Sequence, residues 1–204
     1  MTQEIKVDAN KLRQKVEFLD SIGLKSWTDY EAYARCLSYF DENEKAAEYF
    51  IEAAQLIEKP MAVFEKKNQK EYTRLKLVQA NYYRLAGEKE KSLQQYRELS
   101  KLLEDLFHYV GDKEQSEGLL TNHSYCHFFL QDYEKSIYFG KRVKEWVPVS
   151  LGFSEGILYG DQSRIEAAMD DVIEDIKREK SLPYYTGAEV SLWDWYEIGK
   201  DLLE

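Results

Sequence analysis

Three prolines place the strongest limit on how this chain of 204 residues can fold. Pro60, Pro148 and Pro183 divide it into four segments. Within these segments apolar residues recur at i, i+3, i+4 and i+7, and the period-two alternation of β-strands is nearly absent. Glycine and proline together supply only 13 of the 204 residues. This share is about half of the roughly 12% found in an average protein, which disfavours turn-rich β folds. The sequence therefore predicts an all-α protein.

The apolar spacing also predicts where the helices lie. We expect ten helices, at about 8–22, 28–40, 43–58, 61–86, 88–108, 113–130, 132–146, 152–160, 162–179 and 188–203. Gly87 and Gly160 are expected to end helices, because glycine adopts the left-handed conformation common at that position. Four segments have the pattern of a capping box, in which a side chain covers free amide groups at a helix start. These segments are Thr28–Glu31, Asp41–Glu44, Ser163–Glu166 and Thr186–Glu189.

Small residues recur in pairs along the chain. Each pair is separated by 12 residues, with a turn between its members: Ala34 and Ala46, Ala80 and Ser92, Ser124 and Ser136. Small side chains at these points would let two antiparallel helices approach closely on either side of a tight turn. The units recur after 46 and then 44 residues. The sequence therefore predicts stacked antiparallel helical hairpins, with a plain antiparallel helix bundle as the alternative.

These positions resemble the helix–turn–helix pattern of the tetratricopeptide (TPR) family. The first unit carries the best match, at Tyr30, Tyr33, Ala34, Leu37, Ala46, Phe50 and Ala53. The unit length departs from the usual ~34 residues of the family, so longer helices or inserts are expected. The resemblance implies one helical-repeat domain over 1–204. It would contain an N-terminal helix in 1–27, TPR-like hairpins over 28–178 stacked as a solenoid, and a capping helix in 186–204.

The same span is similar to bacterial antitoxins of the immunity protein 49 type. Such proteins are TPR-like chains of about this size, with Leu-x-Gly-Asp turns and an aromatic-rich last helix. The corresponding segments here are Leu158–Asp161 and Leu192–Tyr196. This resemblance implies a protein that neutralises a toxin by binding it directly.

Motifs for catalysis or cofactor binding are absent from the sequence. It contains no phosphate-binding loop, nucleophile elbow, metalloprotease helix or paired CxxC. We therefore expect no enzyme activity and no cofactor, with an uncharacterised enzyme as the alternative from another class. His123, Cys126 and His127 form the one pattern that suits a metal, because imidazoles at i and i+4 can face one cation. We expect these three residues to pack in the core instead, and we expect no metal site.

Acidic residues concentrate at the end of the chain. Residues 149–204 contribute −8 of the net charge of −10. The acidity of the chain as a whole disfavours nucleic acid and membrane as partners. Asp170, Asp171, Glu174 and Asp175 form like-charge i, i+4 pairs, which destabilise a helix. This cluster is either a solvated face or a landing patch for a basic partner. Trp193 would be an aromatic anchor if it is exposed, although partial burial fits its position equally.

A basic stripe lies earlier in the chain. Lys66, Lys70 and Arg74 follow one another at i, i+4 and i+8 on the helix expected at 61–86. The stripe is an ordinary exposed face, a contact for an anionic partner, or a contact for the acidic last quarter of a second copy of the chain.

The first residues carry no apolar signal segment, and no apolar run reaches the ~18 residues of a membrane span. We therefore expect a cytoplasmic scaffold that binds another protein. The specific hypothesis is an immunity protein that neutralises a basic toxin domain. A peptide-sensing TPR regulator is the alternative within the binding class.

Overall fold

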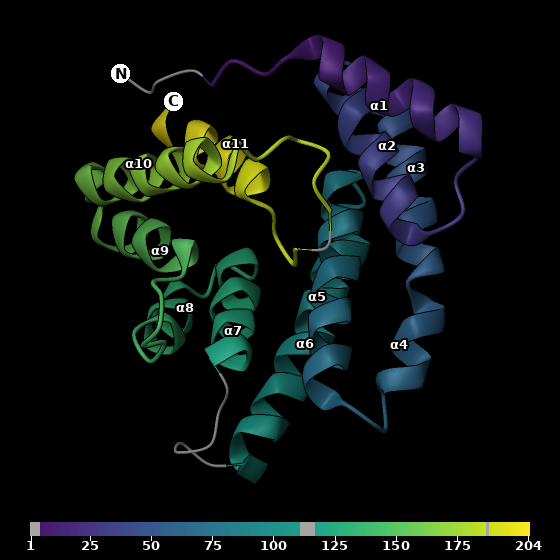
Figure 1. Ribbon diagram of the computed structural model, residues 1–204. Helices are drawn as coiled ribbons and strands as arrows, with labels where there is room; N and C mark the ends of the chain where they lie inside the picture. The colour runs from purple at the N-terminus through teal and green to yellow at the C-terminus, as the bar shows by residue number, and fades with distance from the viewer. Residues whose placement is uncertain (1–4, 111–116, 187) are drawn as a thin grey trace.

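The computed structural model describes residues 5–110, 117–186 and 188–204 (Figure 1). Within these ranges the chain is all-α and contains no β-strand. The helices, in order, are α1 (Ala9–Ile22), α2 (Trp27–Tyr39), α3 (Asn43–Leu56), α4 (Glu58–Phe64), α5 (Gln69–Leu85), α6 (Lys89–Val110), α7 (Glu117–Phe129), α8 (Tyr133–Gly140), α9 (Val149–Tyr159), α10 (Gln162–Glu179) and α11 (Leu192–Leu203). The predicted fold class is confirmed.

Four helical hairpins share the same turn geometry. The pairs α2–α3, α5–α6, α7–α8 and α9–α10 each turn at one residue with positive φ, at Asp41, Gly87, Gln131 and Gly160. In every case the next amide donates to the carbonyl five residues earlier, as Glu42 does to Leu37 (3.0 Å). This is the Schellman arrangement, in which the turn satisfies carbonyl groups that the helix end leaves free. The turns recur after 46, 44 and 29 residues.

Small residues lie at the crossings of the first three hairpins. All six members of the three pairs are buried, with exposed fractions of 3% or less. The Ser92 hydroxyl donates to the Ala80 carbonyl at 3.0 Å, and the Ser136 hydroxyl donates to the Ser124 carbonyl at 2.9 Å. The expected close approach is confirmed. In two of the hairpins the serine also satisfies its own hydroxyl by bonding across the crossing.

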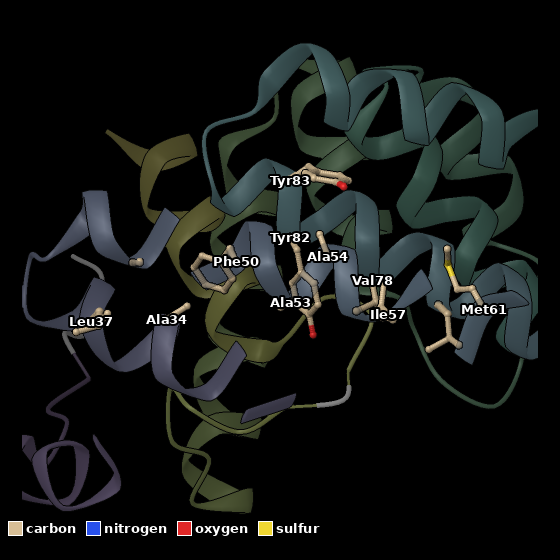
Figure 2. Packing of buried hydrophobic residues seen from close by; sticks show 12 residues of the cluster. Ala34, Leu37, Phe50, Ala53, Ala54, Ile57, Met61, Val78, Tyr82 and Tyr83 are labelled. Carbon is tan, nitrogen blue, oxygen red and sulfur yellow. The ribbon is translucent and has the colours of Figure 1, made fainter. Parts of the chain in front are cut away.

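Two large clusters make up most of the core. One joins α2, α3, α4 and α5, and Figure 2 shows Phe50 and Tyr82 packed within it, with ring centroids 6.1 Å apart. The other joins α7, α9, α10 and α11. Neighbouring hairpins pack in chain order, with α3 against α5, α5 against α7 and α7 against α9. The amino-terminal segment meets the second cluster, where the Tyr196 hydroxyl accepts a hydrogen bond from the Ile5 amide (3.3 Å).

Helix α11 does more than cover the last hairpin. It packs on α10 as a cap would, but its first turn also reaches the other hairpins. Asp194 contacts Arg35 of α2 and Asn81 of α5. Trp195 packs against aromatic rings of α7 and against Phe153 of α9. In Figure 1 the yellow segment before α11 runs from the α10 side of the molecule towards α5. The carboxy-terminal helix is therefore an internal brace that touches at least one helix of every hairpin.

Several predicted helices have different bounds in the structure, and α9 begins at Val149 rather than 152. The helix expected at 61–86 is divided into α4 and α5, because a turn at 65–67 interrupts it and the Asn68 side chain caps α5. Pro60 lies in the first turn of α4, where a missing amide costs no hydrogen bond. The helix expected to reach 146 ends at Gly140, and the final helix begins at Leu192 rather than 188. Residues 113–116, where a further helix start was predicted, lie outside the described residues.

The four predicted capping boxes are wrong. Helix α2 is capped by Ser26 together with Asp29, and α11 by Ser191 together with Asp194. Helix α10 is capped by Asp161, and α3 begins after Glu42 without a side-chain cap. The pattern matched at the wrong register because neighbouring hydroxyl and carboxylate residues offer several equivalent starts.

Candidate functional site

The acidic cluster lies on the outer face of α10. Asp170, Asp171 and Glu174 are exposed, and Asp175 is half-buried. The other face of α10 carries Met169, Val172 and other apolar residues into the core, so the amphipathic pattern directs the acids outward. Among the residues that the structure describes, no cation lies within ion-pair distance of Asp170, Asp171 or Glu174.

A groove of about 500 Å³ runs beside this face, and we call it the α10 groove. One wall is the segment between α8 and α9, with Trp146, Val147 and Pro148; the other is α10. Its lining comprises Trp146, Val147, Pro148, Val149, Gly152, Glu155, Arg164, Ala167, Ala168, Asp171, Val172, Glu174, Asp175 and Arg178. Asp170 is absent from that lining. The groove therefore combines an apolar wall with three members of the acidic cluster.

Small residues let α9, which follows the first wall of the groove, pack close to α10. A Cβ on Gly152 would lie 2.7 Å from Cβ of Ala168, closer than side chains allow. The absence of a side chain at Gly152 thus lets α9 approach α10. Pro148 stands at the N-cap of α9 with ψ of 133°, in the extended conformation. The two residues before it, Trp146 and Val147, remain at the surface.

Trp146 is the aromatic side chain that borders the acids. Its exposed fraction is 44%, and that of Val147 is 75%. The Trp146 indole Nε1 donates to Oγ1 of Thr121 on α7 at 3.2 Å. The ring is therefore partly exposed yet held in one orientation. Sequence reasoning missed it; the available signal was an apolar run, Trp146–Val149, that follows a helix and contains a proline.

The charge of the groove is negative although two arginines line it. Nη2 of Arg178 lies 2.6 Å from Oδ1 of Asp175. Arg164 pairs with Glu155 and with Asp161. Both cations are thus paired within the protein, whereas the side chains of Asp171 and Glu174 are exposed to solvent. An incoming cation would meet two carboxylates without an ion-pair partner among the described residues.

Trp193 does not take part in this site. Its exposed fraction is 8%, and its ring packs against Tyr196 at 5.7 Å between centroids. It lines a different cavity, of about 550 Å³, together with Arg35 and Asp194. The hypothesis that Trp193 is an exposed anchor beside the acids is therefore wrong, because its ring is buried in the cluster that joins α7, α9, α10 and α11.

The basic stripe is not continuous. Lys66 lies in the turn between α4 and α5, whereas Lys70 and Arg74 lie on α5. The Arg74 guanidinium binds Glu71, with Nη2 2.6 Å from Oε1. The stripe expected on one helix is thus interrupted by the turn, and one of its cations is engaged by a neighbouring acid.

His123, Cys126 and His127 are buried side chains of α7. The His123 ring stacks on Phe139 at 4.0 Å and its Nε2 lies 3.1 Å from the Leu103 carbonyl. The Cys126 thiol donates to the Tyr96 carbonyl, so it points away from the imidazoles. Burial lowers the pKa of His123 to about 4. Within the described part of the chain, no group of three or more His, Cys, Asp or Glu side chains is placed to hold a metal ion.

A buried ionic network joins the two halves of the molecule. Arg35 donates to both oxygens of Asp194, at 2.9 and 3.0 Å, and to Glu31 at 2.9 Å. The Tyr82 hydroxyl donates to the other Glu31 oxygen at 2.6 Å. Burial would raise the pKa of Asp194, but the neighbouring Arg35 guanidinium outweighs it and the pKa is lowered. Asp194 is therefore ionised and paired, which suits a structural role.

In comparisons with known proteins, no family model matches the chain, and no curated protein or solved structure matches it significantly. The described residues also include no helix long and apolar enough to cross a membrane.

Proposed function

We propose that this chain is a protein-binding module whose α10 groove receives a segment of another protein that carries basic and apolar side chains. One observation carries the proposal: a half-exposed, hydrogen-bonded Trp146 shares the groove with Asp171 and Glu174. Aromatic anchors of this kind supply much of the binding energy in protein interfaces. Carboxylates beside them favour a basic partner and accelerate its association.

The geometry of Trp146 suits binding. Because Nε1 is already bonded to Thr121, the ring loses little freedom when a partner covers it. Val147 adjoins it and is largely exposed. The apolar wall and the acids of α10 together select a partner with both properties.

The position of α11 favours partner binding at the α10 groove over the alternative function, a peptide-sensing TPR regulator. A regulator of that kind would need an open inner surface along its hairpins. Here Asp194 and Trp195 already contact α2, α5, α7 and α9. The inner positions of the hairpins are engaged by the chain itself, so the outer groove is the better candidate for a partner.

Within the binding class, we propose a cytoplasmic immunity protein that neutralises a basic toxin domain without catalysis of its own. Two features support this form: the resemblance to TPR-like antitoxins and the concentration of −8 of the net charge in residues 149–204. The recurrence of one turn geometry in four hairpins supports the TPR-like assignment.

The groove can be tested with a displayed library of random peptides selected against the full chain. We expect enriched peptides to combine Lys or Arg with apolar residues. Binding should fall for a variant with Asp171→Asn, Glu174→Gln and Asp175→Asn, and separately for Trp146→Ala. A matched control is Glu44→Gln, Glu48→Gln and Glu52→Gln, which removes the same charge from exposed positions of α3. Enrichment of peptides without basic residues, or equal binding by the groove variants, would contradict the proposal.

The proposal that the chain is an immunity protein can be tested separately. A toxin gene adjacent to this one in the native genome would be expressed with and without the chain. We expect the wild-type chain to restore growth and the groove variants to fail, while the α3 control restores it. Rescue by all variants alike would refute the groove as the toxin-binding surface.

A further inference from the structure

A second cavity lies between two hairpin turns, away from the α10 groove. It has a volume of about 600 Å³ and is lined by the α5–α6 turn, the first turns of α6 and the end of α7. Its size is that of small-molecule sites, which range over roughly 300–1,000 Å³. Leu93, Phe129 and Leu130 supply apolar lining.

The charged lining of this cavity is entirely positive. Arg84, Lys89 and Arg97 border it, and no acidic residue is found among the described residues of its lining. This is unusual in a chain with net charge −10. Oδ1 of Asp194 lies 4.0 Å from Nη2 of Arg84, within ion-pair distance but too long for a hydrogen bond.

Two buried polar groups in the lining adjoin each other and have no other hydrogen-bond partner among the described residues. They are the hydroxyl of Tyr96, whose side chain is 1% exposed, and Nη2 of Arg84. Buried polar groups are nearly always satisfied, so each exception requires an explanation. Burial raises the pKa of Tyr96, so the hydroxyl keeps its proton and is a hydrogen-bond donor. The phenol oxygen can accept from the neighbouring Arg84 while its own proton donates to an acceptor in the cavity, and the guanidinium places a positive charge beside that acceptor.

Packing holds these two donors in place. The Arg84 guanidinium lies over the Phe129 ring, 5.1 Å from its centroid. Phe129 in turn stacks on Tyr96 at 5.0 Å between centroids, with the two planes 15° apart. Nε of Arg84 is fixed by a 2.9 Å bond to Oδ1 of Asn81. The donors are thus preorganised, which reduces the entropy lost on binding.

We propose that this cavity binds a small organic anion. Its carboxylate or phosphate group accepts from Tyr96 and Arg84, with Lys89 and Arg97 at the entrance, and its apolar body packs against Leu93 and Leu130. The site is separate from the α10 groove and does not depend on the proposed function.

Calorimetry on the full chain tests this with four probes: 4-phenylbutyrate, phenyl phosphate, inorganic phosphate and uncharged 4-phenylbutanol. We expect at least one organic anion to bind more tightly than the alcohol, with affinity falling as salt rises. The preferred organic anion distinguishes a carboxylate head from a phosphate head, and inorganic phosphate alone should bind more weakly because it has no apolar body. Equal binding of anions and alcohol would leave only an apolar cavity and overturn the proposal, as would the absence of binding by every probe.

Tyr96→Phe is the decisive variant, because it removes the hydroxyl and keeps the ring stack. We expect it to weaken anion binding about tenfold, the effect of losing a hydrogen bond to a charged group. Its thermal stability should change little, since the Arg84 guanidinium beside the hydroxyl keeps its bond to Asn81. Lys91→Gln is the charge control, because its ammonium lies 4.1 Å from the Tyr83 ring and does not line the cavity. The triple variant of the α10 groove should bind the anion unchanged. Unaltered affinity in Tyr96→Phe would refute the assigned donors.

Discussion

His123 shows how burial alters a single side chain. Its imidazole is 1% exposed and packs between Phe107 and Phe139. Desolvation, and then the neighbouring His127, lower its pKa to about 4. The native protein therefore keeps this ring neutral at a pH at which the unfolded chain would protonate it.

This difference predicts a pH-dependent stability. Between pH 6.5 and 4 the unfolded state binds a proton at His123 and the native state does not, so stability falls as the pH falls through that window. We expect a loss of about 2–3 kcal/mol from this residue between pH 7.5 and 4.5. Urea denaturation of wild type and His123→Phe at both pH values measures it. The variant should lose less stability than wild type; an identical loss in both would contradict the prediction.

At the scale of the element, each hairpin depends on small residues at its crossing. Ala34 and Ala80 are fully buried, at 0% exposure. The turn beside each crossing closes with the same hydrogen bonds, between residues at most five apart. Such contacts depend only on neighbouring residues, which is why the sequence could indicate the hairpins.

Enlarging a crossing residue should therefore strain its hairpin. We expect Ala34→Leu and Ala80→Leu to destabilise the protein by about 1–3 kcal/mol each, because the added atoms overpack the interface. Ala62→Leu is the control, since Ala62 is exposed on α4. Denaturant midpoints of the three variants measure the effect. Unchanged midpoints for both core variants would show that the crossings can relax.

For the molecule as a whole, the network around Arg35 connects residues 159 positions apart in the chain. It holds α11 against α2 and α5, and thereby joins the two hydrophobic clusters. Removing one partner of a buried ion pair leaves the other charge uncompensated. The integrity of the whole molecule thus depends on one carboxylate at the start of its last helix.

We expect Asp194→Ala to destabilise the protein by about 3–5 kcal/mol. The same variant loses the side chain that accepts from the Ser191 amide at 2.9 Å. The lowered pKa of Asp194 means that its contribution is present above its ordinary pKa and is lost as the pH falls below it. Asp201→Ala, at an exposed position of the same helix, is the control. Equal stability of the two variants in guanidinium denaturation would argue against the network as a brace.

The candidate site was predictable in part. The acids of α10 could be placed on an outer face because a helix with one apolar stripe must turn its charges to solvent. Trp146 was placed wrongly, at the end of a helix expected to reach 146, whereas that helix ends at Gly140 and Trp146 lies in the irregular segment 141–148. The buried ionic roles of Glu31 and Asp194 were missed for another reason, which is the wrong assignment of the capping boxes. Glu31 was assigned to a capping box in which it takes no part, and Asp194 lies in the box that was missed beside Thr186–Glu189.

The sequence by itself determined the helical class, the hairpin positions and the charge of α10. These features follow from periodicity, turn residues and contacts between near neighbours. Only the tertiary structure decided which aromatic side chain is exposed, that Trp193 is covered while Trp146 is not, and that α11 braces all four hairpins. Burial depends on which distant element covers a surface, and residues separated by 159 positions leave no local pattern that marks them as partners.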